Sequence, residues 1–339
     1  MIRGMYAGIS GMKSQQNKLD VIGNNLANVS TTGFKSSRIV FKDMLYQNSS
    51  NAVGGSMNLG GSNAKQVGLG ASVGSIDRAM TQGMMQPTGR PLDLAIDGNS
   101  FFMVSKGPVA NTKDDITIDN KTGELQDSKG REIFFTRDGS LSLDSDGYLV
   151  TTTGERVLGY SVNGSIRKDG KINFVDIDDP KKPPANPPNN GPLKTDKGLR
   201  TLKIPEEVRD ENGNMKKILS YSIAKDGLIT GVVEGGKVTV LGQLATATFQ
   251  NPEGLETVGN NMYLNSANSG SAVVSTGVGT DPEKVRSGGE ILQGMLEMSN
   301  VDIAEQFTDL IVTSRAFQAS SKIISTSDEI LQDVVNLKR

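Results

Sequence analysis

The chain has 339 residues, with 36 Lys and Arg against 38 Asp and Glu, and it contains no His, Cys or Trp. The absence of His and Cys excludes disulfides, Cys/His zinc sites, thiolate nucleophiles and imidazole bases, so an enzyme would have to use carboxylates, Lys, Ser or Tyr. A net charge of −2 provides no overall field that attracts nucleic acid or an anionic membrane surface.

The sequence gives no sign of membrane insertion. No window approaches the roughly 18 consecutive apolar residues of a membrane span. The first residues are interrupted by Gly4, Gly8, Ser10 and Gly11, and so lack the continuous apolar stretch of a cleaved secretory signal. We therefore expect a protein that is not inserted in a bilayer and that, if it leaves the cell, is exported without a cleaved signal peptide.

The first predicted element is an amphipathic helix over residues 5–29. Its apolar residues recur at steps of three and four, which places them along one face of a helix. Four glycines at 4, 8, 11 and 23 cost about 1 kcal/mol each relative to Ala, so the isolated helix should be poorly formed in water. Either these glycines allow close contact with other helices in an assembly, or the segment is a weak helix that docks on its own domain. The candidate interface residues are Ile2, Met5, Ile9, Met12, Leu19, Ile22 and Leu26.

Residues 34–72 are predicted to be a connector, because residues 54–70 are rich in Gly, Ser and Asn. A first β-domain is expected over 73–160 and 244–290. Short apolar runs alternate there with turn signals at Asp97-Gly98, Asp138-Gly139, Asp146-Gly147 and Thr153-Gly154. Such spacing is typical of a β-sandwich or barrel and not of parallel βαβ units.

Residues 161–243 are predicted to form a second β-domain inserted into the first. Residues 178–192 have the Pro-rich composition of a long surface loop. Strands are expected at 171–177, 199–204, 219–223, 228–233 and 237–241. The first β-domain then resumes at 244–249 and continues through 262–264 and 273–274.

The last predicted element is a long helix that begins after Asn300 as N-cap, carries Asp302 and Glu305 in its first turn, and continues to about residue 337. Ser314 and Ser321 stand at alternate positions of its heptad repeat, which weakens the case for a long dimeric coiled coil. Its candidate interface residues are Ile303, Phe307, Leu310, Phe317, Ile324, Leu331 and Val335.

The expected fold class is therefore α+β. The N- and C-terminal helices pair as a coiled-coil-like core within a terminal helical assembly domain, residues 1–33 and 297–339. Two mainly antiparallel β-domains lie between them. Ends of this kind indicate a protein that assembles.

Motifs that could carry chemistry have simpler interpretations. Asp144-Ser-Asp146-Gly147 lacks the spacing of a calcium loop and is predicted to be a hairpin turn. The glycines of Val67-Gly-Leu-Gly70 precede no helix start and no Gly-Lys-Ser/Thr, so they are attributed to the connector and not to a phosphate loop. Adjacent carboxylates at 114–115, 178–179 and 206–207 are expected to be solvated surface residues. We expect no catalytic residues, no metal and no cofactor.

Several motifs resemble signatures of the bacterial flagellar rod and hook proteins. The N-terminal match runs from Met5-Tyr-Ala-Gly-Ile-Ser-Gly-Met12 through Leu19-Asp-Val-Ile-Gly-Asn-Asn-Leu-Ala-Asn-Val29 to Thr32-Gly-Phe-Lys35. The C-terminal match comprises Glu297-Met-Ser-Asn-Val-Asp-Ile303, Arg315-Ala-Phe317 and Asp328-Glu-Ile-Leu331. Internal matches are Gly89-Arg-Pro-Leu-Asp-Leu-Ala-Ile-Asp97 with Phe101-Phe102, Arg137-Asp-Gly139, Asn251-Pro-Glu-Gly254 and Val258-Gly-Asn-Asn261. The resemblance covers residues 1–160 and 244–339.

The resemblance implies a structural subunit that polymerises into a tube, with the end helices lining a channel and the β-domains facing outward. Of the two similar members, the insert at 161–243 favours the hook subunit, part of a curved universal joint that transmits motor torque to the filament, over the distal rod subunit, part of a drive shaft. The implied partners are further copies of the chain, rod and hook-filament junction proteins, the hook cap and the flagellar export apparatus. The implied location is the extracellular flagellum.

Two other classes of function remain open at this stage. A secreted β-rich hydrolase would need a concave site with converging polar groups, which no part of the sequence indicates. A secreted adhesin or binding module would be a monomer with a ligand pocket in the inserted domain. Electron microscopy of the concentrated protein distinguishes them, because only the axial subunit forms tubes.

Overall fold

The computed structural model describes residues 2–52, 54–55, 60–109, 116–118, 125–127, 130–162, 195–209, 215–275 and 289–337. The chain divides into two compact units. Unit 1 comprises Met1–Val29, Lys35–Ala79 and Val301–Arg339, and unit 2 comprises Ser30–Phe34 and Met80–Asn300. Two long helices and antiparallel strand pairs make up the described residues, so the expected α+β class is confirmed.

Unit 1 contains both long helices, α1 at Ile2–Ala27 and α2 at Ile303–Asn336. At about 1.5 Å per residue they span about 39 and 51 Å. The N-cap of α2 is Asp302, and the expectation of Asn300 is wrong. The Asp302 carboxylate accepts hydrogen bonds from the amides of Ala304 at 2.8 Å and Glu305 at 3.2 Å. Asn300 instead donates to Thr81 Oγ1 within unit 2.

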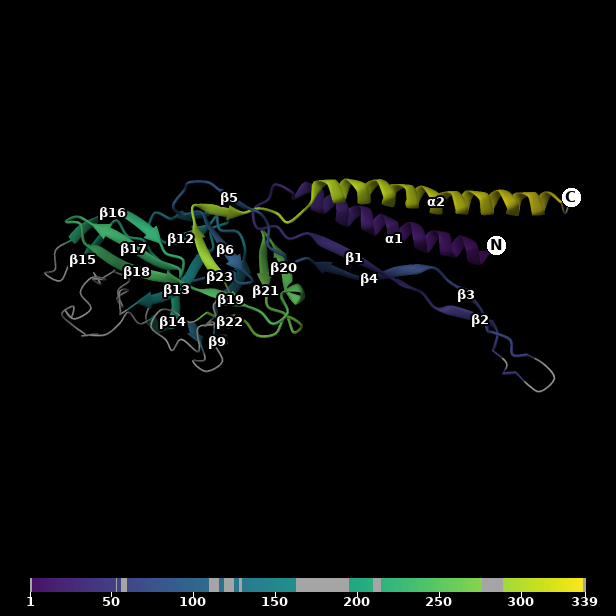
Figure 1. The fold of residues 1–339 in the computed structure, drawn as a ribbon, viewed down its shortest axis with the longest axis horizontal. Coiled ribbons are helices and arrows are strands. Elements are labelled where there is room, and N and C mark those ends of the chain that lie inside the picture. Colours follow the sequence, from purple (N-terminus) through teal and green to yellow (C-terminus); the bar gives the residue numbers. More distant parts are fainter. Residues whose placement is uncertain are drawn as a thin grey trace. The chain divides into compact units, whose positions relative to one another are not determined.

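The described part of residues 34–72 differs from the expected connector, because its strands are paired (Figure 1). Strand β1 (Ser37–Asp43) pairs with β4 (Ala71–Arg78), and β2 (Tyr46–Ser50) pairs with β3 (Lys65–Gly68). Glycine is required at Gly70, where φ is +110° and a Cβ would overlap Ser10 of α1. These strands therefore form a β-layer of unit 1.

The described part of unit 2 consists of short strands and one short 3₁₀ helix, η1 (Pro252–Gly254). The strands are β5 (Met85–Pro87), β6 (Leu94–Gly98), β7 (Phe101–Lys106), β8 (Ile116–Ile118), β9 (Leu125–Asp127), β10 (Glu132–Thr136), β11 (Leu141–Leu143), β12 (Leu149–Thr151), β13 (Arg156–Val162), β14 (Thr195–Thr201), β15 (Glu207–Arg209), β16 (Met215–Ile223), β17 (Leu228–Val233), β18 (Val238–Leu244), β19 (Thr246–Thr248), β20 (Glu256–Gly259), β21 (Met262–Leu264), β22 (Val273–Val274), β23 (Gly289–Gln293) and β24 (Met295–Glu297). Strands β17, β21 and β22 match the ranges expected from the sequence.

Most of these strands join one branched antiparallel sheet. Its longest path is β15-β16-β17-β18-β13-β7-β10-β21-β20, and β23 and β24 pair separately with β6 and β5. The expected hairpin at Asp144-Ser-Asp146-Gly147 is confirmed, since it connects the paired strands β11 and β12, and the Gly147 amide donates to the Asp144 carbonyl at 2.8 Å. Turn chemistry alone thus placed this hairpin.

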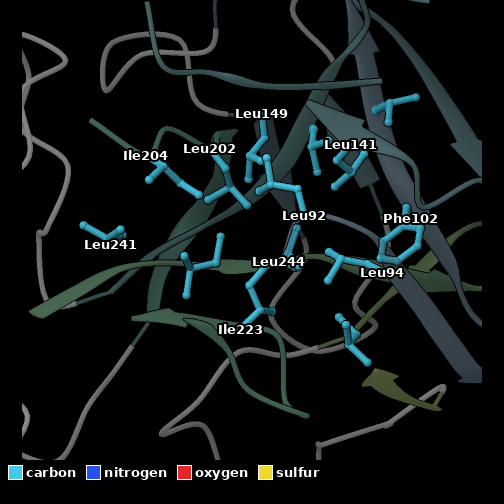
Figure 2. Close-up of a cluster of buried hydrophobic side chains, with 14 of the residues drawn as sticks. Leu92, Leu94, Phe102, Leu141, Leu149, Leu202, Ile204, Ile223, Leu241 and Leu244 are labelled. Atoms are coloured by element: carbon cyan, nitrogen blue, oxygen red, sulfur yellow. The ribbon is translucent and has the colours of Figure 1, made fainter. Parts of the chain in front are cut away.

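The central strand β7 is buried on both faces. Successive side chains of a strand point to opposite faces, so Phe102 and Val104 enter one core cluster while Phe101 and Met103 enter a second. Figure 2 shows part of the first cluster, in which Phe102 and Leu94 lie with Leu141 and Leu244. In the second cluster, the rings of Phe101 and Phe249 meet edge to face at 5.7 Å.

The described strands of residues 161–243 share the core of their neighbours. Leu202, Ile223 and Leu241 from this segment belong to the same cluster as Leu92 and Phe102 (Figure 2). A small separate cluster, Val162, Leu228 and Val240, lies wholly within the segment, so its described residues combine a shared core with a minor one of their own. The expected strand at 171–177 and the Pro-rich loop at 178–192 lie outside the described residues.

Candidate assembly surface

Within unit 1, α1 and α2 lie side by side and run in opposite directions (Figure 1). Near the end of α1, Asn25 Nδ2 donates to Gln306 Oε1 at 3.2 Å, and Lys18 Nζ lies 3.2 Å from Asp309 Oδ2. Near its start, Gly8 faces Ile324, and a Cβ at residue 8 would lie 3.3 Å from Ile324 Cγ1. Residue numbers that rise along α1 thus fall along α2, so the pair is antiparallel.

The face of α2 that meets α1 follows alternating steps of three and four residues. This spacing keeps one stripe on one side of a helix. Apolar residues alternate in it with hydroxyl residues, so the contact is only half apolar. Its partly or fully buried members are Leu310, Thr313, Phe317, Ser320, Ile324, Ser327 and Leu331.

The structure separates the expected interface residues of α2 into two groups. Leu310, Phe317, Ile324 and Leu331 are partly buried on the face toward α1. The others are exposed by about half or more, with Ile303 at 48%, Phe307 at 49% and Val335 at 66%.

The expected interface residues of α1 divide in the same way. Ile22 is buried, while Ile9 is 42% exposed. Met5, Met12, Leu19 and Leu26 are partly exposed, and the side chain of Ile2 lies outside the described residues. In the α1 repeat, Ile22 is thus buried, Ile9 is exposed, and the other described members are half-buried, like the α2 residues on the contact face.

The β-layer of unit 1 covers another side of α1. Ser14 Oγ donates to the carbonyl of Ala71 at 3.3 Å. The Asn25 side chain donates to the Ser37 carbonyl at 2.8 Å and accepts from the Ser37 amide at 2.9 Å. These paired bonds fix the position where β1 begins relative to the end of α1.

A buried ion pair lies in unit 2, and with the chain segments it holds we call it the clasp. Arg137 Nη1 lies 3.3 Å from Glu297 Oε2, and the two side chains are 2% and 0% exposed. The other Glu297 oxygen accepts from the Gly83 amide at 2.9 Å. Arg137 Nη2 donates to the Gly98 carbonyl at 2.6 Å, and the guanidinium lies 4.9 Å from the ring centre of Phe101. Each charge is therefore compensated by several partners, as burial demands.

The clasp also holds the segment 30–34. The Gly33 amide donates to the Glu297 carbonyl at 2.8 Å, and Thr32 Oγ1 donates to Asp138 Oδ1 at 2.9 Å. Asn261 Nδ2 donates to the Thr32 carbonyl at 2.8 Å. Gly33 has φ of +68°, and a Cβ there would lie 2.7 Å from the Asp138 amide nitrogen. The segment that follows α1 and the strand β24 that precedes α2 are thus fastened at one place in unit 2.

Burial is the main cause of the pKa shifts of Arg137 and of the neighbouring Asp138. It lowers the pKa of Arg137, and the neighbouring Glu297 carboxylate opposes that shift. Burial raises the pKa of Asp138, while hydrogen bonds from the Ser140 amide and Thr32 oppose the rise. The Asp138 carboxylate is therefore easier to protonate in the folded protein than in the unfolded chain.

Sequence reasoning did not foresee the clasp. Arg137, Glu297 and Asn261 were singled out only as members of motifs, and no local pattern pairs charges separated by 160 residues. One signal in the sequence could have indicated the clasp. Short motifs that contain a Gly or a charged residue occur far apart in the chain, outside the two terminal helices. A buried meeting point explains why such residues occur outside the helices.

The described residues hold no group of three or more Asp, Glu, His or Cys side chains suited to a metal ion. Glu206 and Glu207 are exposed, as expected of solvated carboxylates. The pairs at 114–115 and 178–179 lie outside the described residues. Neither long helix, over the residues described, combines the length and apolarity needed to span a membrane.

Three family models match the chain: "Flagella basal body rod protein" over residues 5–35, "Flagellar hook protein FlgE/F/G D1 domain" over 124–231, and "Flagellar basal body rod FlgEFG protein C-terminal" over 292–337. The chain is 39% identical to the flagellar basal-body rod protein FlgG of Bacillus subtilis, with all of both chains covered. It is 29% identical to the flagellar hook protein FlgE of Borreliella burgdorferi, again over all of both chains. The crystal structure of the Helicobacter pylori flagellar hook protein FlgE2 matches 63% of this chain and all of that chain at 12% identity, with a TM-score of 0.39.

The matches to both ends and to the β-rich middle define a structural protein of the bacterial flagellar axis, and this class is not a class of enzymes. The chain belongs to the flagellar rod and hook protein family, and its role is that of a structural subunit of the hook or the rod. The resemblance seen in the sequence is thereby confirmed.

Proposed function

We propose that the chain is an axial subunit that polymerises into a tube through α1 and α2. The observation that carries this proposal is the apolar surface left on the helix pair. Phe307, Val312 and Val335 on α2 and Ile9 on α1 are each more than 40% exposed. Fully burying such a side chain contributes about 1.5–3 kcal/mol. These side chains stay exposed in the isolated subunit, so contact between copies would gain this free energy of burial.

Within this family we favour the distal rod, a segment of the drive shaft, as the position of the subunit. Identity to the rod protein FlgG is 39%, against 29% to the hook protein FlgE. The alignment with FlgG has 339 positions, the length of this chain, whereas that with FlgE has 472. The hook relative thus has 133 positions without a counterpart here.

The hook remains the second candidate, in which the subunit forms part of a curved universal joint that transmits motor torque to the filament. The observation that favours it is the segment 161–243, which we propose is inserted between the flanking strands as an outer extension. In a bending tube, outer segments of neighbouring copies would slide while the helices stay in contact. In a drive shaft the same segments would instead resist sliding.

Assembly on the flagellar axis implies a set of partners. We propose contacts with further copies of the chain, with rod and hook-filament junction proteins, and with the hook cap during growth. We also propose export by the flagellar apparatus without a cleaved signal peptide to an extracellular position. The glycines of α1 support this route, because a helix that is weak by itself stays unfolded more readily during transit.

Polymerisation is tested by changing exposed apolar residues. In the variant Phe307→Ser/Val335→Ser, we expect an unchanged circular dichroism spectrum in the monomer and loss of tubes in electron micrographs. The matched control is Thr308→Ser/Asn336→Ser, which alters the neighbouring exposed positions and should still form tubes. Deletion of residues 300–339 should likewise leave a folded β-protein that does not polymerise. Normal tubes from the apolar variant or from the deletion would refute the proposal.

The position on the axis is tested by immunogold labelling. Antibodies raised against residues 215–275 are applied to isolated hook-basal bodies and observed by electron microscopy. Gold on the straight shaft next to the basal-body rings supports the distal rod, and gold along the curved segment outside the envelope supports the hook.

A further inference from the structure

Both helices of unit 1 carry an apolar stripe beside their mutual contact. The α1 stripe consists of Met5, Ile9, Met12, Leu19 and Leu26, of which Ile9 is 42% exposed and the other four are half-buried. The α2 stripe consists of Val312, Ala316, Ile323, Ile330 and Leu337, of which Val312 is 58% and Leu337 is 86% exposed. The α1 stripe recurs at steps of three, four and seven residues and the α2 stripe at steps of four and seven, the spacing of helices that pack lengthwise.

The two stripes lie on opposite sides of the helix pair. In α1, stripe residues follow the contact residues by one position, as Ile9 follows Gly8. In α2, stripe residues precede the residues of the face toward α1 by one position, as Val312 precedes Thr313, and Ile323 borders that face because its Cγ2 would lie 3.6 Å from a Cβ at residue 8. One residue rotates a side chain by about 100° around a helix. In an antiparallel pair, moving one residue forward from the contact face turns the side chain toward the same side of the pair in both helices. The α1 stripe is one residue forward and the α2 stripe one residue backward, so the two stripes lie on opposite sides of the pair.

This arrangement selects the symmetry of assembly. A two-fold dimer pairs a surface with itself, so it would cover one stripe in each copy and leave the other exposed. A head-to-tail contact places the α1 stripe of one copy on the α2 stripe of the next, and every interior copy then has both stripes covered. Such a contact repeats without closing after two copies, as a tube requires.

The stripes also match in length and charge. From Met5 to Leu26 the α1 stripe extends about 32 Å, and from Val312 to Leu337 the α2 stripe extends about 38 Å, at about 1.5 Å per residue. Neither stripe contains a charged residue. The side of α2 that faces away from α1 carries polar residues at every seventh position, which suits contact with water. They are Thr308, Arg315, Lys322, Glu329 and Asn336.

We propose that the α1 stripe of one copy packs on the α2 stripe of a second copy, head to tail. This inference rests on the proposed polymerisation and specifies its geometry. The occupant of each stripe is a second copy of this chain, because each copy supplies both complementary surfaces and cannot bring them together by itself.

The test uses disulfide crosslinking, because the natural chain contains no Cys. Three double variants combine Met12→Cys with Val312→Cys, Ile330→Cys or Leu337→Cys. A bond within one copy is excluded by distance. Gly11 faces Ser320, so Met12 lies near the level of residue 319, and these α2 positions lie at least seven residues, about 10 Å, along the helix from that level. A disulfide requires Cα atoms about 4.4–6.8 Å apart.

Polymers of each variant, verified by electron microscopy, are oxidised and separated on a denaturing gel. We expect at least one double variant to give a ladder of trimers and longer covalent chains. The single variant Met12→Cys should give monomers. The matched control Met12→Cys/Glu329→Cys moves the second thiol by one residue to the polar side, and its ladder should be at least tenfold weaker. A variant that does not polymerise alone is copolymerised with an equal amount of unmodified chain, and covalent dimers are then scored.

Opposite results would overturn the pairing. Polymers without crosslinks in all three double variants would do so, as would dimers from Met12→Cys alone or a stronger ladder from the Glu329→Cys control. In each of these cases polymers exist, so the proposed function stands while the head-to-tail geometry fails. If the unmodified chain forms no polymers under any condition, the proposed function itself fails and the inference with it.

Discussion

Removing one partner of the clasp should strongly destabilise unit 2. Arg137→Met removes the cation that compensates Glu297, and both side chains are almost fully buried at 2% and 0% exposure. The Glu297 carboxylate would keep the Gly83 amide but would have lost its ion-pair partner. Breaking a buried pair in this way costs about 3–5 kcal/mol. That is a large part of the roughly 5–15 kcal/mol by which a typical domain is stable.

The measurement is urea unfolding of the monomeric full-length protein, followed by far-ultraviolet circular dichroism. Arg137→Met and Glu297→Gln should each lower the free energy of unfolding by the amount stated. The double variant should lose less than the sum of the two, because the second change removes a charge that the first left uncompensated. A coupling free energy of about 0.5–3 kcal/mol is expected for residues in direct contact.

The matched control is the exposed pair Lys225–Glu290, whose atoms are 2.9 Å apart but whose side chains are 74% and 58% exposed. Because water solvates both groups, Lys225→Met should leave the unfolding midpoint unchanged. The reasoning is refuted if Arg137→Met lowers the free energy of unfolding by less than about 1 kcal/mol with an unchanged denaturant slope, or if the control variant is destabilised equally.

Three further changes test single features of the fold. Burial raises the pKa of the Asp138 carboxyl above 3.8, so the folded state binds this proton more tightly than the unfolded chain does. As pH falls through the folded-state pKa toward 3.8, wild type should therefore gain stability relative to Asp138→Asn. A stability difference that stays constant in urea unfolding from about pH 7 to about pH 4 would contradict this. Asp302→Ala should cost about 1 kcal/mol and speed hydrogen exchange in the first turn of α2, and unchanged exchange would rule out its capping role. Gly33 and Gly154 both have positive φ, so replacing either by Ala should cost about 1–3 kcal/mol. Gly33→Ala should reduce stability in thermal unfolding by more than Gly154→Ala, because only at Gly33 would the added Cβ overlap neighbouring backbone. Equal losses would exclude the close approach.

Local patterns were sufficient for elements whose residues interact with near neighbours. The apolar repeats predicted both helices, and α1 runs from Ile2 to Ala27 where residues 5–29 were expected. Turn residues predicted the β11–β12 hairpin. Such elements satisfy their backbone hydrogen bonds within a short stretch, so their signals are contained in that stretch.

The contact face of α2 was only half predictable. Leu310 and Phe317 were expected on it and lie there, but the alternate positions belong to Thr313 and Ser320 and not to the more apolar Phe307. The reason lies in the partner: the facing residues of α1 include Gly11 and Lys18, which suit small and polar neighbours. A helix's own hydrophobicity cannot reveal the shape of a surface supplied by another segment.

The sequence by itself determined that two amphipathic helices enclose a β-rich middle and that the chain resembles rod and hook proteins, because both properties are written in short local motifs. Only the tertiary structure decided which helix faces meet, which apolar stripes stay exposed, and that Arg137 and Glu297 are buried together. Those outcomes depend on segments that are 160 or more residues apart in the chain. Their contact depends on complementary shape and on charge compensation between distant segments, so the sequence of one segment does not predict it.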